Sequence, residues 1–182
     1  MVNDGRITPN LLANCAARYR PGQRPFLAAI VGSVHVGKTT RLRALFDACK
    51  PLPRGGFAEV ACFDDAVRLG YDFVDLRTGQ RICVARRQSE PDKDGCRYTF
   101  SPEAWTWADE CLRQVPERGI AFVDELGKLE AMHGGVWGAL TACMARGQVA
   151  AVVACVREDI SFEMAMALGG FDHVESFIHE VL

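Results

Sequence analysis

The chain alternates between short apolar runs and segments whose apolar residues recur at helical spacing. Short runs bounded by turn residues predict buried strands, and apolar residues three or four positions apart predict helices. The predicted strands cover 26–31, 120–123, 149–155 and about 174–178. The predicted helices begin after Thr8, after Gly37 and after Ser101, or cover 134–146 and 160–168. Strands that alternate with helices are typical of an α/β fold with a mostly parallel sheet and helices on both faces.

The middle of the chain has a different pattern. The segments 57–62, 68–76 and 81–85 have the composition of strands, and short turns such as Thr78-Gly79 join them. Successive strands with short connections pair antiparallel, so we expect meander strands at one edge of the sheet. The polar segment 88–95 contains Pro91 and predicts an exposed loop.

The organisation of the chain is simple. No internal repeat, low-complexity tract or long linker interrupts the 182 residues, which predicts a single domain over 1–182. Residues 1–24 precede the first predicted strand, and we expect them to form an N-terminal helical extension. No run approaches the roughly 18 apolar residues of a membrane helix. Residues 1–10 are polar and unlike a targeting signal, so we expect a cytoplasmic protein without a membrane partner.

Charge and cysteine content exclude further classes. The formal net charge is −2, which gives no basic footprint for a nucleic-acid partner. The eight cysteines form no CxxC pair, and most lie in apolar runs, where a thiol behaves as a small apolar group. We expect reduced, structural cysteines rather than redox or metal sites: Cys15, Cys49, Cys62, Cys83, Cys96, Cys111, Cys143 and Cys155.

One segment carries a phosphate-binding pattern. Residues 32–39 match G-x-x-x-x-G-K-[ST] at every fixed position, between a predicted strand and a predicted helix. Gly32 and Gly37 allow a sharp turn whose amides converge on phosphate oxygens. We expect Lys38 to reach the β- and γ-phosphates and the Thr39 hydroxyl to ligate Mg²⁺. The predicted nucleotide-binding residues are Gly32, Ser33, Val34, His35, Val36, Gly37, Lys38, Thr39 and Thr40.

A second motif places two acids at a strand end. The apolar run 120–123 is followed by Asp124 and Glu125. In a P-loop enzyme the first acid holds Mg²⁺ opposite the Thr39 hydroxyl. Strand alternation predicts that the two carboxylates point to opposite sides, so Glu125 is left free to act as the general base for an attacking water. The acid pair favours an ATPase-like over a GTPase-like enzyme.

The stretch 124–130, Asp-Glu-Leu-Gly-Lys-Leu-Glu, together with Val36 to Thr40, resembles a family of small nucleoside triphosphatases known from thermophiles and, in vertebrates, as cancer-related nucleoside triphosphatase. Gly56-Phe57 and Gly70-Tyr71 fall in the family's order, and the resemblance covers about residues 26–155. It implies a three-layer, RecA-like P-loop fold with antiparallel additions, and slow, base-tolerant hydrolysis of ATP, GTP and other triphosphates. The resemblance also implies that Lys38, Thr39, Asp124 and Glu125 have the roles of the matching residues in the family.

The chain departs from the family at three places. Val34-His35 replaces Pro-Gly, so that His35 either adds a donor near the γ-phosphate or points to solvent. Ala58-Glu59-Val60 replaces a Thr and Glu pattern, which leaves a third catalytic carboxylate open. The 24 residues before the first strand form an added helix or a partner surface.

Further cations are expected near the transferred phosphate, where arginine commonly offsets developing charge. Arg157, after the strand 149–155, is the main candidate in cis, with a plain surface role as the alternative. Arg86, Arg87 and Arg97 are other candidates near the meander. Lys128 approaches the γ-phosphate, pairs with Glu125, or is a solvated lysine at a helix start.

The leading hypothesis is Mg²⁺-dependent hydrolysis of nucleoside triphosphates to diphosphate and phosphate. Two alternatives stay open. One is a P-loop kinase for a nucleotide or small metabolite, with 88–97 as a short lid. The other is a nucleotide-gated switch with little turnover and a partner at the N-terminal helix. The pattern is compatible with a protein partner or a homo-oligomer, and it does not encode a base preference.

Overall fold

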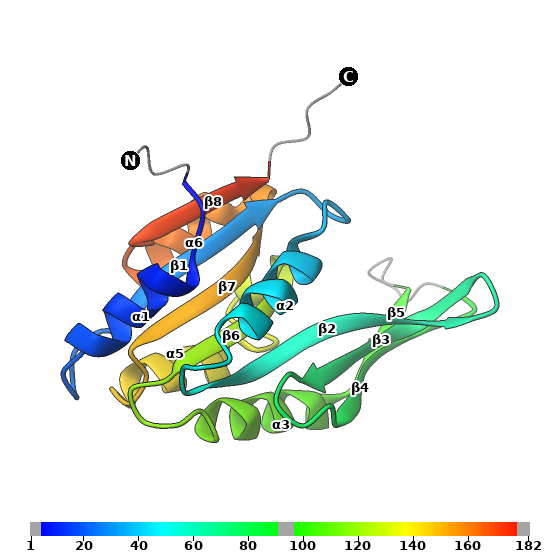
Figure 1. The fold of residues 1–182 in the computed structure, drawn as a ribbon. Coiled ribbons are helices and arrows are strands. Elements are labelled where there is room, and N and C mark those ends of the chain that lie inside the picture. The colour runs from blue at the N-terminus through cyan, green and yellow to red at the C-terminus, as the bar shows by residue number, and fades with distance from the viewer. Residues whose placement is uncertain (1–4, 91–96, 178–182) are drawn as a thin grey trace.

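The computed structural model describes residues 5–90 and 97–177 (Figure 1). Within them the strands are β1 (Phe26–Gly32), β2 (Arg54–Asp64), β3 (Val67–Asp75), β4 (Arg81–Arg87), β5 (Tyr98–Phe100), β6 (Ile120–Leu126), β7 (Ala151–Arg157) and β8 (His173–Phe177). They form one sheet in the order β5-β4-β3-β2-β6-β7-β1-β8. The five strands from β2 to β8 in this order pair in parallel, and β3, β4 and β5 add antiparallel strands beyond β2. The predicted mostly parallel sheet with antiparallel strands at one edge is confirmed.

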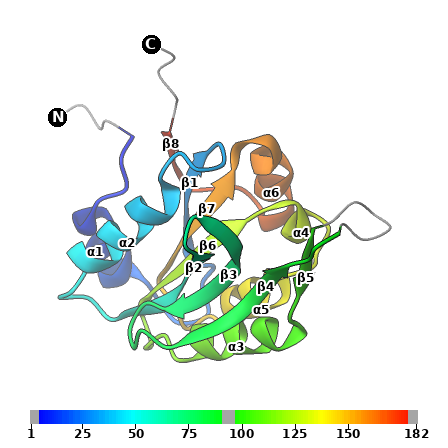
Figure 2. The same ribbon diagram turned by 90° about the vertical axis from the view of Figure 1, so that its right-hand side faces the viewer.

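Helices cover both faces of this sheet and make three layers (Figure 2). The helices are α1 (Pro9–Arg18), α2 (Lys38–Ala48), α3 (Pro102–Arg113), α4 (Lys128–Ala131), α5 (Trp137–Ala145) and α6 (Ser161–Leu168), with a 3₁₀ turn at Glu158–Ile160. The helices α1 and α2 pack on one face, and α3, α5 and α6 on the other. The three-residue β5 and the four-residue α4 are too short to give a periodic signal, and the sequence pattern did not predict them.

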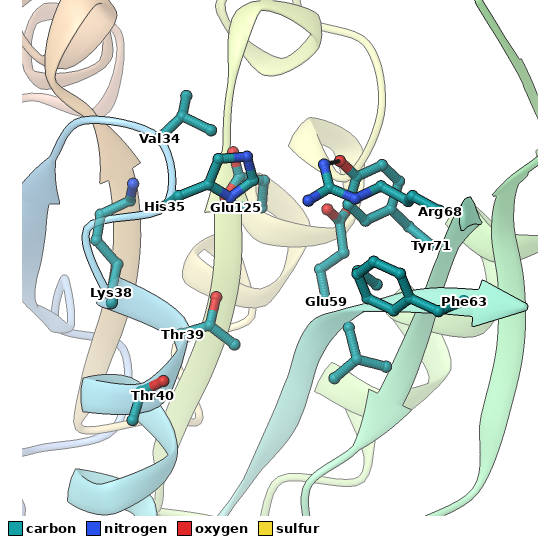
Figure 3. A pocket seen from close by; sticks show the side chains of 13 residues that line it. Val34, His35, Lys38, Thr39, Thr40, Glu59, Phe63, Arg68, Tyr71 and Glu125 are labelled. Carbon is teal, nitrogen blue, oxygen red and sulfur yellow. Dashed lines mark hydrogen bonds between the residues drawn. The ribbon is translucent and has the colours of Figure 1, made fainter. Parts of the chain in front are cut away.

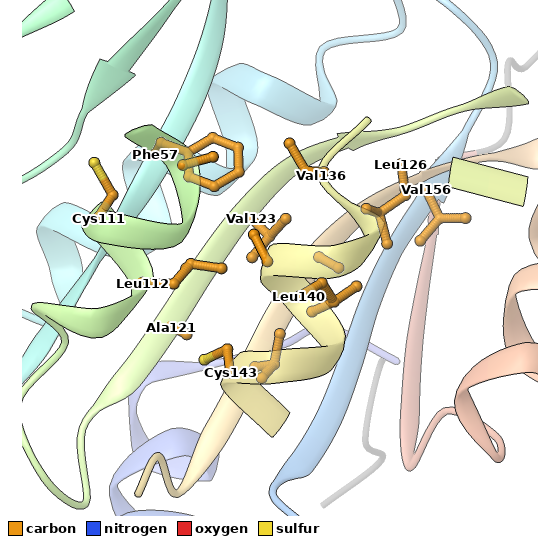
Figure 4. Close-up of a cluster of buried hydrophobic side chains, with 14 of the residues drawn as sticks. Phe57, Cys111, Leu112, Ala121, Val123, Leu126, Val136, Leu140, Cys143 and Val156 are labelled. Carbon is orange, nitrogen blue, oxygen red and sulfur yellow. The ribbon is translucent and has the colours of Figure 1, made fainter. Parts of the chain in front are cut away.

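A core of apolar side chains lies on each face of the sheet. Under α3 and α5 the core includes Phe57, Leu112 and Leu140 (Figure 4). Under α2 the rings of Phe46 and Phe122 pack edge to face with centroids 5.3 Å apart. The central strands are buried on both faces, which explains their continuous apolar runs.

A glycine permits the junction between β2 and the central sheet. Gly56 has φ of +124°, and a Cβ atom there would lie 1.9 Å from the carbonyl oxygen of Phe122 on β6. Only glycine tolerates both this backbone conformation and this close approach. The Gly56-Phe57 pair therefore sets the point where the antiparallel additions meet the parallel strands.

The topology brings the two sequence motifs to one edge of the sheet. Strand β7 lies between β1 and β6, and all three run in parallel. The segment after β1 and the end of β6 therefore face the same edge, where α/β sheets bind their ligands.

The N-terminal extension is tied to the sheet by a buried ion pair. Ile7 and Leu12 are fully buried, and Thr8 caps α1 by accepting from the amide of Leu11 at 3.2 Å. Glu175 on β8 accepts from the Ile7 amide at 2.7 Å and from Arg41 Nε at 2.7 Å. Arg41 lies on α2, so this carboxylate joins the extension, the edge strand and the helix that follows the phosphate-loop segment.

Glu175→Ala is expected to destabilise the fold by about 2–3 kcal/mol, because it removes the acceptor of the Ile7 amide and the carboxylate that pairs with the partly buried Arg41 guanidinium. Urea denaturation of the variant and the parent gives the difference. The control is Glu110→Ala, an exposed position on α3, for which we expect a change within about 0.5 kcal/mol. Equal stability of Glu175→Ala and the parent would contradict this role.

The described residues contain neither a membrane-spanning helix nor a disulfide bond. None of their helices combines the length and the hydropathy that crossing a bilayer requires. Their seven cysteines are free thiols, four of them buried: Cys49, Cys111, Cys143 and Cys155. Cys96 and residues 91–95 of the predicted loop 88–95 lie outside the described residues.

Candidate active site

The phosphate-loop segment follows β1 directly and leads into α2. His35 and Gly37 adopt left-handed backbone conformations, with φ of +66° and +101°. At Gly32 a Cβ atom would come within 2.8 Å of Val36 Cγ1, so the loop closes tightly on its first glycine. The α2 N-terminus starts at Lys38 and presents free amides toward the loop.

Lys38 is held against the loop (Figure 3). Its side chain is buried, and Nζ donates to the carbonyl oxygens of Gly32 at 3.0 Å and Ser33 at 2.7 Å. The ammonium group is thereby fixed at two carbonyl oxygens of the loop, beside the cavity that the loop lines. This is the position in which a phosphate-loop lysine acts.

Asp124 is buried at the end of β6, beside the start of α2. Its carboxylate accepts from the amides of Glu125 at 3.0 Å and Glu59 at 3.1 Å. The Thr39 hydroxyl and the Cys155 thiol are also hydrogen-bonded to it. Burial raises the pKa of Asp124 to about 6, although these hydrogen bonds act to lower it. Asp124 and Thr39, predicted as metal ligands, therefore lie in contact.

Glu125 occupies an irregular point in β6. Its φ is +57°, and the pairing of β6 with β7 shifts register between Val123 and Leu126. The expected regular strand alternation is therefore wrong at this pair, since a left-handed residue in a bulge aims the second side chain instead. Glu125 lines a cavity beside the phosphate loop, whereas Asp124 is buried beneath it. The two acids have different environments, but the cause is the bulge at Glu125 and not regular strand alternation.

A third carboxylate reaches the same cavity from β2. Glu59 lines the cavity, and burial raises its pKa to about 8, with the charge of Glu125 as the next cause. The sequence pattern left a carboxylate at this position open. A lone acid inside an apolar strand soon after Gly56-Phe57 is the one local signal that could have pointed to it.

Glu130 braces the loop that follows β6. Its two oxygens accept from the amides of Gly127 at 2.9 Å and Val136 at 3.1 Å. At Gly135, with φ of +56°, a Cβ atom would lie 2.0 Å from the Glu130 carboxylate. The last acid of the motif 124–130 thus holds α4 and its loop in place and has a structural task.

The two further predicted cations, Arg157 and Lys128, line a second cavity that also includes Glu59 and Glu125. Arg157 ends β7 and binds Asp159 through Nε at 3.0 Å and Nη2 at 2.7 Å, next to Ser33 and Val34. Lys128 is exposed at the start of α4. Among the ion pairs of the described residues none joins Lys128 to Glu125, so the pairing of these two side chains considered above is absent.

A cavity of about 410 Å³ brings the phosphate loop together with Glu59 and Glu125. One wall is the phosphate loop and the start of α2, and the facing wall belongs to the meander (Figure 3). The polar and charged side chains of its lining include His35, Lys38, Thr39, Glu59, Arg68, Tyr71 and Glu125. Its size suits a small polar ligand.

The oxygen donors fit a hard divalent cation. In the described residues no group of three or more His, Cys, Asp or Glu side chains could enclose a metal ion. Mg²⁺ does not need such a cage, because it usually takes one or two protein oxygens and completes its shell with phosphate and water. The contacting Thr39 hydroxyl and Asp124 carboxylate match that requirement.

The sheet order, with a glycine-rich loop between β1 and α2 and an acidic end of β6, defines a P-loop NTPase fold. A family model described as "NTPase" matches residues 28–175. The chain belongs to this NTPase family.

Relatives with established names agree with this placement. The chain is 32% identical over 103 residues to nucleoside-triphosphatase THEP1 of Pyrobaculum aerophilum, covering 56% of this chain and 57% of that protein. It is 29% identical over 113 residues to the protein of the same name from Pyrobaculum calidifontis, covering 62% of this chain and 63% of the relative. The chain therefore matches less than two thirds of the length of these relatives.

Solved structures share the fold. The human cancer-related nucleoside triphosphatase superposes with a TM-score of 0.61 at 16% identity, over 87% of this chain and 90% of the other. THEP1 from Aquifex aeolicus superposes with a TM-score of 0.62 at 17% identity, over 83% of this chain and 88% of the other. At such identities the likeness shows the architecture alone.

Proposed function

We propose that this chain hydrolyses the terminal phosphate of nucleoside triphosphates, with Mg²⁺ as cofactor. The observation that carries the proposal is the convergence of Lys38, Thr39 and Glu125 on one cavity, with Asp124 buried against Thr39. Family membership and the names of the relatives support it. Slow turnover and tolerance of the base are part of the proposal, as is a cytoplasmic location.

Each residue has a distinct task in this mechanism. The loop amides and Lys38 bind the phosphate chain and offset its charge. Thr39 and Asp124 would hold the magnesium ion, which would offset negative charge on the phosphate chain. Glu125 accepts a proton from the attacking water. The water oxygen bonds to the γ-phosphorus, and the bridging oxygen leaves with the electron pair on the diphosphate.

Phosphate release without an added acceptor tests this function. We expect release from ATP, GTP, CTP and UTP at rates within about tenfold of each other, because the loop contacts only phosphates. Omitting Mg²⁺ in the presence of a chelator is expected to stop release. Turnover that requires an acceptor alcohol or amine would instead establish a kinase, and nucleotide retention without release would establish a switch.

A further inference from the structure

The wall of the cavity that faces the phosphate loop carries one arginine, Arg68. We propose that Arg68 is a catalytic arginine supplied in cis, whose guanidinium binds the terminal phosphate from the side opposite Lys38. The inference rests on the proposed hydrolysis and adds a residue that no sequence motif indicated.

Arg68 belongs to β3, close to the tight turn between β2 and β3. Its side chain extends from the meander into the cavity, toward Glu125 and His35 (Figure 3). Lys38 and Arg68 are the Lys and Arg side chains among the residues that line this cavity, and they come from opposite walls. A phosphoryl group between them would have a cation on each side.

The guanidinium is oriented by one hydrogen bond and two aromatic rings, and one of its buried donors has no partner among the described residues. Nη1 donates to the Tyr71 hydroxyl at 2.9 Å. The guanidinium carbon lies 5.7 Å from the ring centre of Phe63 and 5.5 Å from that of Tyr71. Nε is buried and has no hydrogen-bond partner in the part of the chain that the structure describes. An anion in the cavity would give this guanidinium a charged partner.

Two irregularities in strand pairing lie close to Arg68. Pairing of β2 with β3 shifts register between Cys62 and Phe63, directly opposite Arg68. Pairing of β3 with β4 shifts again between Tyr71 and Asp72. Such bulges increase strand twist and re-aim side chains near active sites. Two of them bracket the segment that carries the arginine and the tyrosine that holds it.

The negative charge of the carboxylates at the cavity also favours a cation on this wall. Glu125 lines the cavity and Asp124 lies beneath it, so a triphosphate would enter beside two carboxylates. The arginines suggested by the sequence pattern either pair with an acid or lie outside the lining of this cavity. Arg157 is bound in a bidentate pair to Asp159, and Arg86 to Asp72 at 2.8 Å. Arg87 and Arg97 are not among the residues that line the cavity.

The chemical role is electrostatic. As the water oxygen bonds to phosphorus and the bridging oxygen leaves, negative charge spreads over the equatorial oxygens of the transferred group. Arg68 would donate hydrogen bonds to those oxygens and neither gain nor lose a proton. Its planar fork suits phosphate geometry better than an ammonium group does.

Steady-state phosphate release by Arg68→Ala, Arg68→Lys and the parent enzyme tests the inference. For Arg68→Ala we expect kcat to fall about 10²- to 10³-fold, the usual effect of removing one transition-state donor, with KM changed less than about threefold. Arg68→Lys is expected to recover only part of the loss. The matched control is Arg81→Ala, an exposed arginine on β4, which is expected to keep the parent's kcat.

A positioning role for Tyr71 gives a second readout. Tyr71→Phe keeps the ring and removes the hydroxyl that fixes Nη1, so kcat is expected to fall about tenfold while KM stays unchanged. A purely structural role would lower the unfolding temperature and leave kcat of the folded fraction intact.

The outcomes separate this inference from the proposed function. A parent enzyme that hydrolyses triphosphates alongside an equally active Arg68→Ala variant would overturn the role of Arg68 and leave the function standing. If the parent releases no phosphate, the proposed function fails. In that case the binding of ADP with aluminium fluoride, which mimics the transferred phosphoryl group, tests whether Arg68 contacts that group. Weaker binding by Arg68→Ala supports the contact, and equal binding overturns it.

Discussion

Glu125→Gln is expected to lower kcat for phosphate release about 10³-fold while nucleotide affinity stays within about threefold of the parent. The amide has the size of the carboxylate but cannot take a proton from the attacking water. Glu125 is the acid that lines the cavity next to the phosphate loop, at a bulge with a left-handed backbone. Such strained conformations in non-glycine residues cluster at functional sites.

The measurement is a single-turnover assay with radiolabelled ATP, together with equilibrium binding of a fluorescent nucleotide. The control is Glu110→Gln on α3, exposed and far from the cavity, which is expected to behave like the parent. Parent-like turnover by Glu125→Gln would show that another group orients the water. Glu59 would then be the next candidate, because it lines the same cavity.

Lys38→Met is expected to lower kcat/KM for ATP by about 10³-fold or more, because it removes the buried cation that offsets charge on the phosphates. Methionine keeps the aliphatic stem of the side chain, so the loop should retain its packing. The loss is expected both in nucleotide affinity and in kcat, since the ammonium contacts substrate and transition state alike.

The matched control for this variant lies just after the same helix and uses the same substitution. Lys50 follows the end of α2 and its side chain is 72% exposed, so Lys50→Met is expected to leave kcat/KM unchanged. Phosphate release across a range of ATP concentrations gives both parameters. Parent-like kcat/KM in Lys38→Met would show that the phosphates bind elsewhere.

The fold and the phosphate loop could be predicted because their signals are local. The loop 32–39 needs glycines and a lysine at fixed positions between a strand and a helix, and each requirement is visible in sequence. The apolar runs that became β1, β6 and β7 are buried on both faces, which leaves no ambiguity in their pattern. The antiparallel edge followed from the short turns between successive strands.

The rest of the candidate site depends on contacts between distant segments. Arg68 faces Lys38 only because the meander folds back over the parallel strands, and nothing near residue 68 resembles a motif. The same holds for Glu59, whose amide binds Asp124 sixty-five positions away. Arg157 sits at a strand end as predicted, but a local partner two residues later, Asp159, takes up its guanidinium.

Hydrophobic periodicity also does not predict the local irregularities of strands and helices. Strand alternation gave the wrong geometry at Asp124 and Glu125, because a bulge interrupts the pairing there. The segment 134–146 predicted one helix, whereas Gly134 and Gly135 precede α5 and Glu130 braces the loop between α4 and α5. Such features arise from side chains that satisfy buried amides, and periodicity does not record those contacts.

The most direct test of the central claim is a crystal structure of Glu125→Gln with ATP and Mg²⁺. We predict the β- and γ-phosphates on the amides of residues 33–39 with Lys38 beside them, the metal at Thr39 and Asp124, and residue 125 facing a water in line with the γ-phosphorus. A triphosphate bound outside this cavity, or a residue 125 turned away from the γ-phosphate, would contradict the account.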